Sequence, residues 1–439
     1  MRPIMQATWI WMLTASALLA ASGCEGKGTG GTGGGEPAAP SCPSRFADCD
    51  GDPGNGCEAA LRTSVESCGA CGHACATPAS ATALCVDGTC AFACKPGTGD
   101  CDGDPGNGCE ATLATDVANC GACGAACSKT CTEGTCDVTV LAQGQLSPIV
   151  VAVDATSVYW LNYGPMGMAS GAVMRVDKAG SAPTAFASGL MNPRALLLDG
   201  DEVYWATSDG SIQRAPKAGG PPTTLAQNQS APVALAIAKG VLYWANTGTA
   251  PSFTDGAILA LDLQSPGATP VSLGVIPGGL AALVVAGGSL YATVFGSGQN
   301  PDGSLWRVGL SPQAGTPQLV SGALSSPSAL VGTPDGLWLS AQMAILSTPT
   351  GGTTPPRSLV AELTAQPLLL ALDGDRLWWT TLSANDGRIA SAGLDGSSPN
   401  TRAHGLAAPR GIAVDESHVY WTQVSKGVPA SGTVLSMPK

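Results

Sequence analysis

A unit that begins at a proline recurs seven times in the C-terminal two-thirds of the chain. Its clearest copy runs from Pro193 to Trp205 and consists of apolar residues, a tight acidic turn and an aromatic segment. The other copies begin at Pro148, Pro232, Pro277, Pro327, Pro367 and Pro409. The copy at Pro277 reaches its aromatic segment three residues late. Short strands that repeat about every 40 residues are typical of a β-propeller or a solenoid.

The repeat also predicts how the domain closes. A third apolar strand, such as residues 211–215, follows each aromatic segment, and a fourth, such as residues 222–227, follows in six units. The seventh unit ends at Lys439 without a fourth strand, whereas residues 138–144 resemble residues 222–228 and precede the first unit. We therefore predict an all-β domain over residues 138–439, a seven-bladed β-propeller closed by its own N-terminal strand. The alternative, an open solenoid, leaves that first strand without a partner.

The aromatic segments carry a family resemblance. Four of them are Tyr159-Trp160, Tyr204-Trp205, Tyr243-Trp244 and Tyr420-Trp421. They resemble the YWTD-type propellers of receptor ectodomains and the related NHL-type propellers, although the family's aspartate after Tyr-Trp-Thr is absent and six blades are common in the YWTD group. The resemblance implies a propeller and no particular ligand. We expect the tryptophans to pack between blades.

Four aspartates recur six residues after their prolines: Asp154, Asp199, Asp373 and Asp415. One interpretation is that these four carboxylates, in register, form a catalytic ring. The interpretation we favour is structural, because aspartate at the start of a turn accepts hydrogen bonds from nearby backbone amides.

Sixteen of the 17 cysteines lie in two modules, predicted at residues 42–90 and 91–137. Eight cysteines in each module predict four disulfides with 105 connectivities, and modules this small need such cross-links for stability. The cysteines are Cys42, Cys49, Cys57, Cys68, Cys71, Cys75, Cys85 and Cys90, then Cys94, Cys101, Cys109, Cys120, Cys123, Cys127, Cys131 and Cys136. Their Cys-Asp-Gly-Asp-Pro-Gly-Asn-Gly-Cys and Cys-Gly-Ala-Cys-Gly patterns resemble cysteine-rich repeats of bacterial surface proteins.

Two alternatives to a purely structural role for the modules are a zinc or redox site and a calcium site. Cys68-Gly-Ala-Cys71 and Cys120-Gly-Ala-Cys123 have the spacing of zinc or thioredoxin-like sites, but an exported chain favours structural disulfides. The acidic turns offer calcium ligands, although Pro53 excludes an EF-hand loop. The candidate calcium ligands are Asp48, Asp50, Asp52, Asp100, Asp102 and Asp104, supported by Asn55, Glu58, Asn107 and Glu110. We expect no other cofactor, and turn formation is the simpler role for these residues.

The N-terminus predicts export. Residues 1–23 combine Arg2 with an apolar run and small residues, as in a signal peptide. Ala21-Ser22-Gly23-Cys24 resembles the lipobox of bacterial lipoproteins, with Ala21 where leucine is usual. That family implies an acylated Cys24, a lipid bilayer as partner, and a bacterial outer-membrane or cell-surface location. The Gly-rich composition that follows predicts a flexible tether over residues 24–41. An ordinary signal peptide with an incidental cysteine is the alternative.

The composition and the loop lengths limit the classes of function that this chain can have. Charged residues make up 12% of the chain and the net charge is −12, which argues against nucleic-acid binding. The three histidines show no metal-ligand spacing. Long loops between second and third strands favour a binding surface for a protein or glycan. The candidate ligand-binding residues are Tyr163, Arg194, Phe253, Phe295, His404, Arg410 and Lys426.

We therefore predict a non-enzymatic surface lipoprotein whose propeller is a binding scaffold. A propeller lyase or hydrolase is the first alternative, and a cluster of Arg194, His404 and Arg410 at the channel mouth would favour it. Calcium-dependent adhesion is the second alternative.

Replacement of Cys24 by Ser tests the anchor. We expect the Cys24→Ser protein to leave the membrane fraction, because it loses the thiol that carries the acyl chains. Fractionation followed by immunoblotting measures this, with Ser41→Ala in the tether as the control that stays membrane-bound. Continued membrane retention of Cys24→Ser would refute the lipid anchor.

Overall fold

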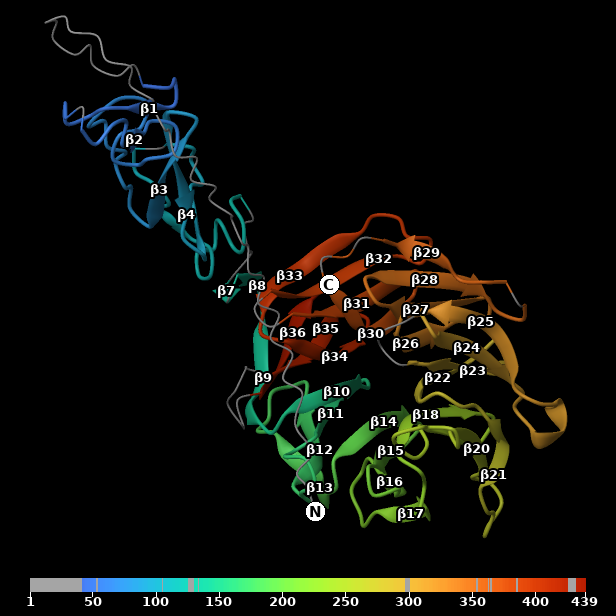
Figure 1. The fold of residues 1–439 in the computed structure, drawn as a ribbon. Helices are drawn as coiled ribbons and strands as arrows, with labels where there is room; N and C mark the ends of the chain where they lie inside the picture. The colour runs from blue at the N-terminus through green and yellow to red at the C-terminus, as the bar shows by residue number, and fades with distance from the viewer. Residues whose placement is uncertain are drawn as a thin grey trace, which may run out of the picture. The chain divides into compact units, whose positions relative to one another are not determined.

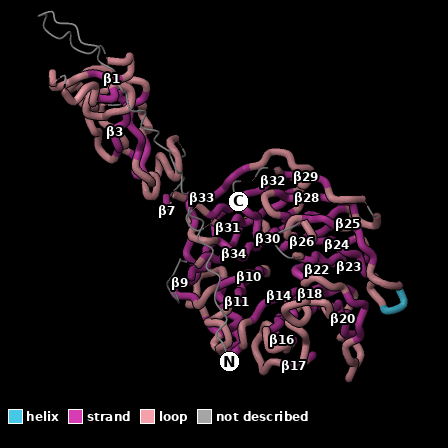
Figure 2. Tube along the Cα trace, in the orientation of Figure 1, coloured by secondary structure: helices cyan, strands magenta, loops and turns pink. Residues whose placement is uncertain are grey.

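The computed structural model describes residues 42–52, 54–104, 106–124, 130–132, 134–296, 301–352, 354–361, 363, 365–383, 386–424 and 432–439. They divide into two compact units, one ending at Cys75 with Cys85–Thr89 added, the other formed by Ala76–Leu84 and Cys90–Lys439. The predicted signal peptide, Cys24 and tether lie outside the described residues. Within these residues, no helix has the length and hydropathy to cross a membrane. The short 3-10 helix η1 (Pro312–Ala314) is the helical segment in Figure 2.

Seven four-stranded antiparallel sheets form the propeller, each a blade (Figure 1). The first strands of blades 1 to 7 are β10 (Pro148–Val153), β14 (Pro193–Asp199), β18 (Pro232–Ala238), β22 (Leu280–Ala286), β26 (Pro327–Gly332), β30 (Gln366–Asp373) and β34 (Pro409–Val414). The second strands are β11 (Ser157–Asn162), β15 (Glu202–Thr207), β19 (Val241–Asn246), β23 (Ser289–Val294), β27 (Gly336–Ala341), β31 (Arg376–Leu382) and β35 (His418–Gln423). Consecutive first strands contact one another and form the inner ring.

The outer half of each blade follows the same order. The third strands are β12 (Gly171–Asp177), β16 (Ile212–Pro216), β20 (Ala257–Asp262), β24 (Gly303–Val308), β28 (Ala344–Pro349), β32 (Gly387–Gly393) and β36 (Gly432–Pro438). The fourth strands of blades 1 to 6 are β13 (Thr184–Leu190), β17 (Thr223–Ala226), β21 (Val271–Val275), β25 (Gln318–Leu324), β29 (Arg357–Val360) and β33 (Asn400–Leu406). The predicted all-β, seven-bladed architecture is confirmed, including the late start of blade 4 at Leu280.

Blade 7 is built from both ends of the propeller sequence. Strand β9 (Thr139–Gln145) pairs with β36, so that Gln145 lies opposite Gly432 and Ala142 opposite Val434. The sheet order is β34-β35-β36-β9. The predicted closure by the N-terminal strand is therefore confirmed, and the open solenoid is excluded.

The Tyr-Trp dipeptide of the second strand holds neighbouring blades together. Successive side chains of a strand point to opposite faces, so the tyrosine faces the next blade and the tryptophan faces the previous one. Tyr159 shares an apolar cluster with Trp205, and Tyr204 shares one with Trp244. Trp160, Trp205, Trp244 and Trp421 are fully buried. The prediction that these tryptophans pack between blades is confirmed.

Four of the repeating prolines lie against glycines of the preceding blade. A Cβ atom on Gly387, at the start of β32, would overlap the Cδ atom of Pro409, and Gly171 and Pro193 show the same arrangement. At the point of ring closure, Gly432 of blade 7 lies in the same way against Pro148 of blade 1. The proline ring thus occupies space that a side chain on the third strand would fill, which joins adjacent blades at close range.

Of the four recurring aspartates, Asp154 and Asp415 cap turns, and Asp154, Asp373 and Asp415 pair with lysines of neighbouring blades. The Asp154 carboxylate accepts hydrogen bonds from the Thr156 and Ser157 amides, at 2.9 and 2.8 Å, as predicted. Its other oxygen lies 3.0 Å from Lys217 Nζ of the next blade. The equivalent pairs are Lys178 with Asp415 at 2.6 Å and Lys439 with Asp373 at 2.5 Å. These three pairs connect blade 1 to blade 2, blade 7 to blade 1, and blade 6 to blade 7, so they surround the junction where the ring closes.

The cysteine-rich modules consist of short hairpins and disulfides. Their strand pairs are β1 (Phe46–Ala47) with β2 (Ala59–Ala60), β3 (Ala81–Val86) with β4 (Thr89–Cys94), β5 (Thr98–Gly99) with β6 (Ala111–Thr112), and β7 (Cys131–Thr132) with β8 (Thr135–Cys136). The disulfides include Cys42–Cys57, Cys49–Cys71, Cys68–Cys85, Cys94–Cys109, Cys101–Cys123 and Cys120–Cys131. The second module repeats the pairing of the first, which confirms the predicted disulfide framework. Cys127 lies outside the described residues.

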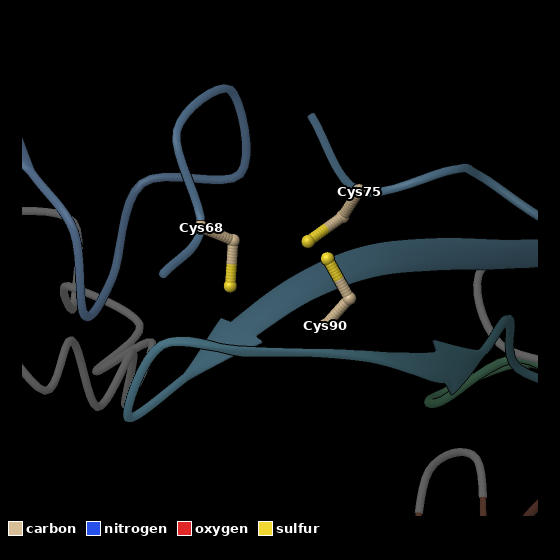
Figure 3. A group of neighbouring side chains, drawn as sticks. All are labelled: Cys68, Cys75 and Cys90. Carbon is tan, nitrogen blue, oxygen red and sulfur yellow. The ribbon is translucent and has the colours of Figure 1, made fainter. Parts of the chain in front are cut away.

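The two Cys-Gly-Ala-Cys motifs do not form redox or zinc sites, because all four of their cysteines are in disulfides with cysteines outside the motif. Cys68 is bonded to Cys85 and Cys71 to Cys49, so the two cysteines of the first Cys-Gly-Ala-Cys motif have different partners. The sulfur atoms of Cys68, Cys75 and Cys90 lie within 4.8 Å of one another (Figure 3). All three cysteines are disulfide-bonded, and a sulfur in a disulfide is not the thiolate that binds a metal.

Substitution of Gly432 by Ala tests the ring-closing contact. We expect Gly432→Ala to lower the free energy of unfolding by about 1–3 kcal/mol, because the added Cβ must displace Pro148. Gly322→Ala, on the outer strand β25 where space is open, is the matched control in thermal or urea unfolding. Equal stability of the two variants would contradict this role of Gly432.

The ion pair across the closure predicts a pH-dependent stability. Lys178→Met should cost about 1–2 kcal/mol at pH 7, because it leaves the half-buried Asp415 carboxylate without its cation. Since the folded state holds the pKa of Asp415 below its usual 3.8, this stabilisation is present above that pH and decreases as the pH falls below it.

Urea unfolding at pH 7, 4 and 3 measures this effect. The stability difference between wild type and Lys178→Met should shrink as the pH falls, and Lys239→Met, on an exposed turn, is the control. A difference that stays constant with pH would mean that Lys178 acts through packing alone.

Candidate functional site

Every blade begins with a β-bulge at the same end of the inner ring. The register between first and second strands shifts directly after Pro148, Pro193 and their equivalents in all seven blades. A bulge places two residues opposite one and redirects a side chain, which is why bulges recur near binding sites. The residue directly after the repeating proline, or after Leu280 in blade 4, is Ile149, Arg194, Val233, Ala281, Ser328, Leu368 or Arg410.

A cavity of about 480 Å³ lies at this end of the inner ring, which we call the channel mouth. Its polar lining consists of Ser147, Tyr163, Arg194 and Arg410. Its apolar lining consists of Ile149, Val150, Val233, Leu368 and Leu369. The volume lies within the range of small-molecule sites, and an apolar wall with few polar groups is their usual character.

Hydroxyl groups of the second strands fix the bulges that precede this cavity. Thr422 Oγ1 accepts a hydrogen bond from the Gly411 amide at 2.9 Å, beside Arg410. Thr380 Oγ1 of blade 6 donates to the Arg410 carbonyl at 2.8 Å and accepts from the Leu369 amide at 3.3 Å. These bonds satisfy backbone groups near the bulge, so the backbone that carries Arg410 is held from two blades.

The channel mouth unites three of the predicted ligand-binding residues, Tyr163, Arg194 and Arg410. Phe253 and Phe295 lie elsewhere, where their backbones bond Gly278 and Gly279 between blades 3 and 4. His404 lies on β33, the outer strand of blade 6, and Lys426 lies outside the described residues. Sequence reasoning missed the apolar residues that complete the cavity. Their shared position directly after the repeating proline is the signal that could have found Ile149, Val233 and Leu368.

A second cavity of about 660 Å³ lies at the closure, beside Asp415, Lys178 and Tyr420. Asp415 accepts hydrogen bonds from Lys178 Nζ at 2.6 Å and from the Tyr420 hydroxyl at 2.7 Å, besides the Ser417 and His418 amides. Burial opposes ionisation of Asp415, but the bond from Lys178 and the other donors hold its pKa below the usual value. Burial, reinforced by Asp415, raises the pKa of Tyr420. Asp415 is therefore occupied by structural partners.

The acidic turns bring carboxylates together in the same way in both modules. Oxygen atoms of Asp48, Asp50 and Glu58 lie within 4.8 Å of one another, and those of Asp100, Asp102 and Glu110 do likewise. Asp52 and Asp104 are outside these groups, and their carboxylates accept from the Gly54 and Gly106 amides at 2.8 Å.

Local hydrogen bonds stabilise the ionised form of these carboxylates. The Asp52 amide and the Asn55 side chain lower the pKa of Asp50, and the equivalent bonds of Asp104 and Asn107 lower that of Asp102. Ionised carboxylates are hard oxygen ligands that fit calcium, while the hydrogen bonds by themselves suffice to form the turns.

Comparison with known proteins gives the fold and no family. No protein-family model matches the chain, and no curated protein does either. A puromycin-hydrolysing peptidase of Mycobacterium tuberculosis superposes with a TM-score of 0.52 at 15% identity, over 67% of this chain and 51% of that one.

Two further structures superpose less closely. The computationally designed protein Ika8 gives a TM-score of 0.48 at 16% identity, over 65% of this chain and 84% of that one. A chain of the nidogen/laminin complex gives 0.41 at 18% identity, over 56% of this chain and 92% of that one. At such low identity, these likenesses carry no activity to this chain.

Proposed function

We propose that this protein is an exported binding protein, whose propeller holds a ligand at the channel mouth and whose cysteine-rich modules connect it to an acylated N-terminus. The observation that carries the proposal is the convergence of Arg194, Arg410 and Tyr163 on one cavity of about 480 Å³. These residues come from blades 2, 7 and 1, which are neighbours because the ring closes. The rest of the cavity wall is mainly apolar, as in small-molecule sites.

The chemistry of the lining favours binding over catalysis. Its described residues supply two guanidinium groups, a phenol and a serine hydroxyl, and none of them is a carboxylate or an imidazole. A general acid or base near neutral pH is most often one of those two groups. Arg194 and Arg410 share the cavity as the enzyme alternative requires, but His404 does not line it. The arrangement therefore supports a non-enzymatic scaffold.

The disulfide framework supports the extracellular part of the proposal. Disulfides of this density persist in oxidising compartments, and a signal peptide would deliver the chain to one. Acylation at Cys24 would then retain the protein at a bacterial envelope membrane. The resemblance of the Tyr-Trp segments to YWTD-type propellers of receptor ectodomains is consistent with a binding role.

A variant that fills the channel mouth tests the proposed function. In Val233→Trp the larger side chain should occupy the cavity, and small molecules that co-purify with the wild type should be absent. Mass spectrometry after denaturation of protein purified from its native source measures them. Val271→Trp, on the exposed outer strand β21, is the matched control. Identical molecules released from wild type and Val233→Trp would reject the channel mouth as the ligand site.

Calcium-dependent adhesion is the second candidate function, favoured by the repeated carboxylate groups of the two modules. If calcium binds there, titration calorimetry of the full chain should show binding heat that disappears in a Glu58→Gln, Glu110→Gln double variant. Asp87→Asn, outside both groups, is the control. Unchanged heat in the double variant, or none in the wild type, would leave these residues with a structural role.

A further inference from the structure

We propose that the ligand of the channel mouth is a small organic anion, a carboxylate attached to an apolar body. This inference rests on the proposed function, because it takes the cavity as a ligand site and assigns the chemistry of its occupant. The anionic group is assigned to Arg194 and Arg410, and the apolar body to the aliphatic residues on either side of them.

The propeller fold does not require an arginine at position 194 or at position 410. A register shift occurs at this position in all seven blades, and the residue equivalent to Arg194 and Arg410 is uncharged in the other five blades. These five residues are Ile149, Val233, Ala281, Ser328 and Leu368. Five blades therefore form the bulge without a cation, so the two arginines have a role that the fold does not require.

Neither arginine has an anionic partner within the described part of the chain. The lysines near the ring closure, Lys178, Lys217 and Lys439, are all paired with aspartates. Arg194 and Arg410 take part in no ion pair among the described residues, and no carboxylate occurs among the described residues that line the cavity with them. In a chain of net charge −12, the channel mouth is thus locally cationic. Guanidinium groups recognise carboxylates through charge-assisted hydrogen bonds.

The order of the blades places the charge between apolar walls. Arg410 and Arg194 belong to blades 7 and 2, on either side of blade 1, which contributes Tyr163. The next blades outward contribute Leu368 from blade 6 and Val233 from blade 3. An anion held between the arginines would therefore have hydrocarbon surface on both sides, which favours an apolar body over a small hydrated ion.

Calorimetric titration of the full chain with defined probes tests the inference. The probes are octanoate, octylammonium, and the tripeptide acetyl-Leu-Leu-Leu as its free acid and as its amide, which separate a free acid from a polypeptide C-terminus. We expect at least one of the two acids to bind, and octylammonium and the amide not to bind. Arg194→Gln and Arg410→Gln should each weaken binding about tenfold to a hundredfold. Arg357→Gln, an exposed arginine on β29, should leave it unchanged.

The outcomes separate this inference from the proposed function. Binding of octanoate alone identifies a free acid and binding of the tripeptide acid alone a polypeptide terminus, and both support the inference. Octylammonium binding as tightly as octanoate, unchanged affinity in both arginine variants, or binding of neither acid overturns it. If Val233→Trp still excludes a co-purifying molecule in that case, the proposed ligand site stands and only the anionic ligand is rejected.

Discussion

The pairing of β9 with β36 is the interaction on which the rest of the propeller depends. It joins the two ends of the domain and supplies blade 7 with its fourth strand, β9. It also removes the open sheet edges that an unclosed array would expose. Closure also makes blades 7 and 1 neighbours, so Arg410 comes to lie near Tyr163 and Arg194. The candidate ligand site is thus a product of ring closure, and the Gly432–Pro148 contact and the Lys178–Asp415 ion pair stabilise the same junction.

Two kinds of position coexist in the repeat. The Tyr-Trp dipeptide contacts blades on both sides, and in four blades the third strand begins with a glycine that lies against the next proline, so packing constrains these residues. The residue directly after the repeating proline, or after Leu280 in blade 4, is under less constraint, because it varies from alanine to arginine without loss of the bulge. Such a tolerant position on a rigid scaffold is where specificity can change without cost to the fold.

The two cysteine-rich modules reach stability by another route. Their strands are mostly two residues long and their apolar core is small, so disulfides replace the packing that holds the propeller together. The aspartates of their turns accept backbone amides two or three residues ahead, and both modules repeat these bonds at an offset of 52 residues. Hydrogen bonds already form these turns, so a bound calcium ion would only stabilise them further.

The sequence by itself determined the seven blades, the closing strand, the buried tryptophans and the presence of disulfides, because each follows from local periodicity and residue type. It did not determine which cysteines pair, since 105 connectivities fit one spacing. Only the tertiary structure decided which glycines lie against the prolines and which lysine, 237 residues away, pairs with Asp415. It also decided that Arg194 and Arg410 line one cavity. These contacts join residues of different blades, and blades become neighbours only after the chain has curved into a closed ring.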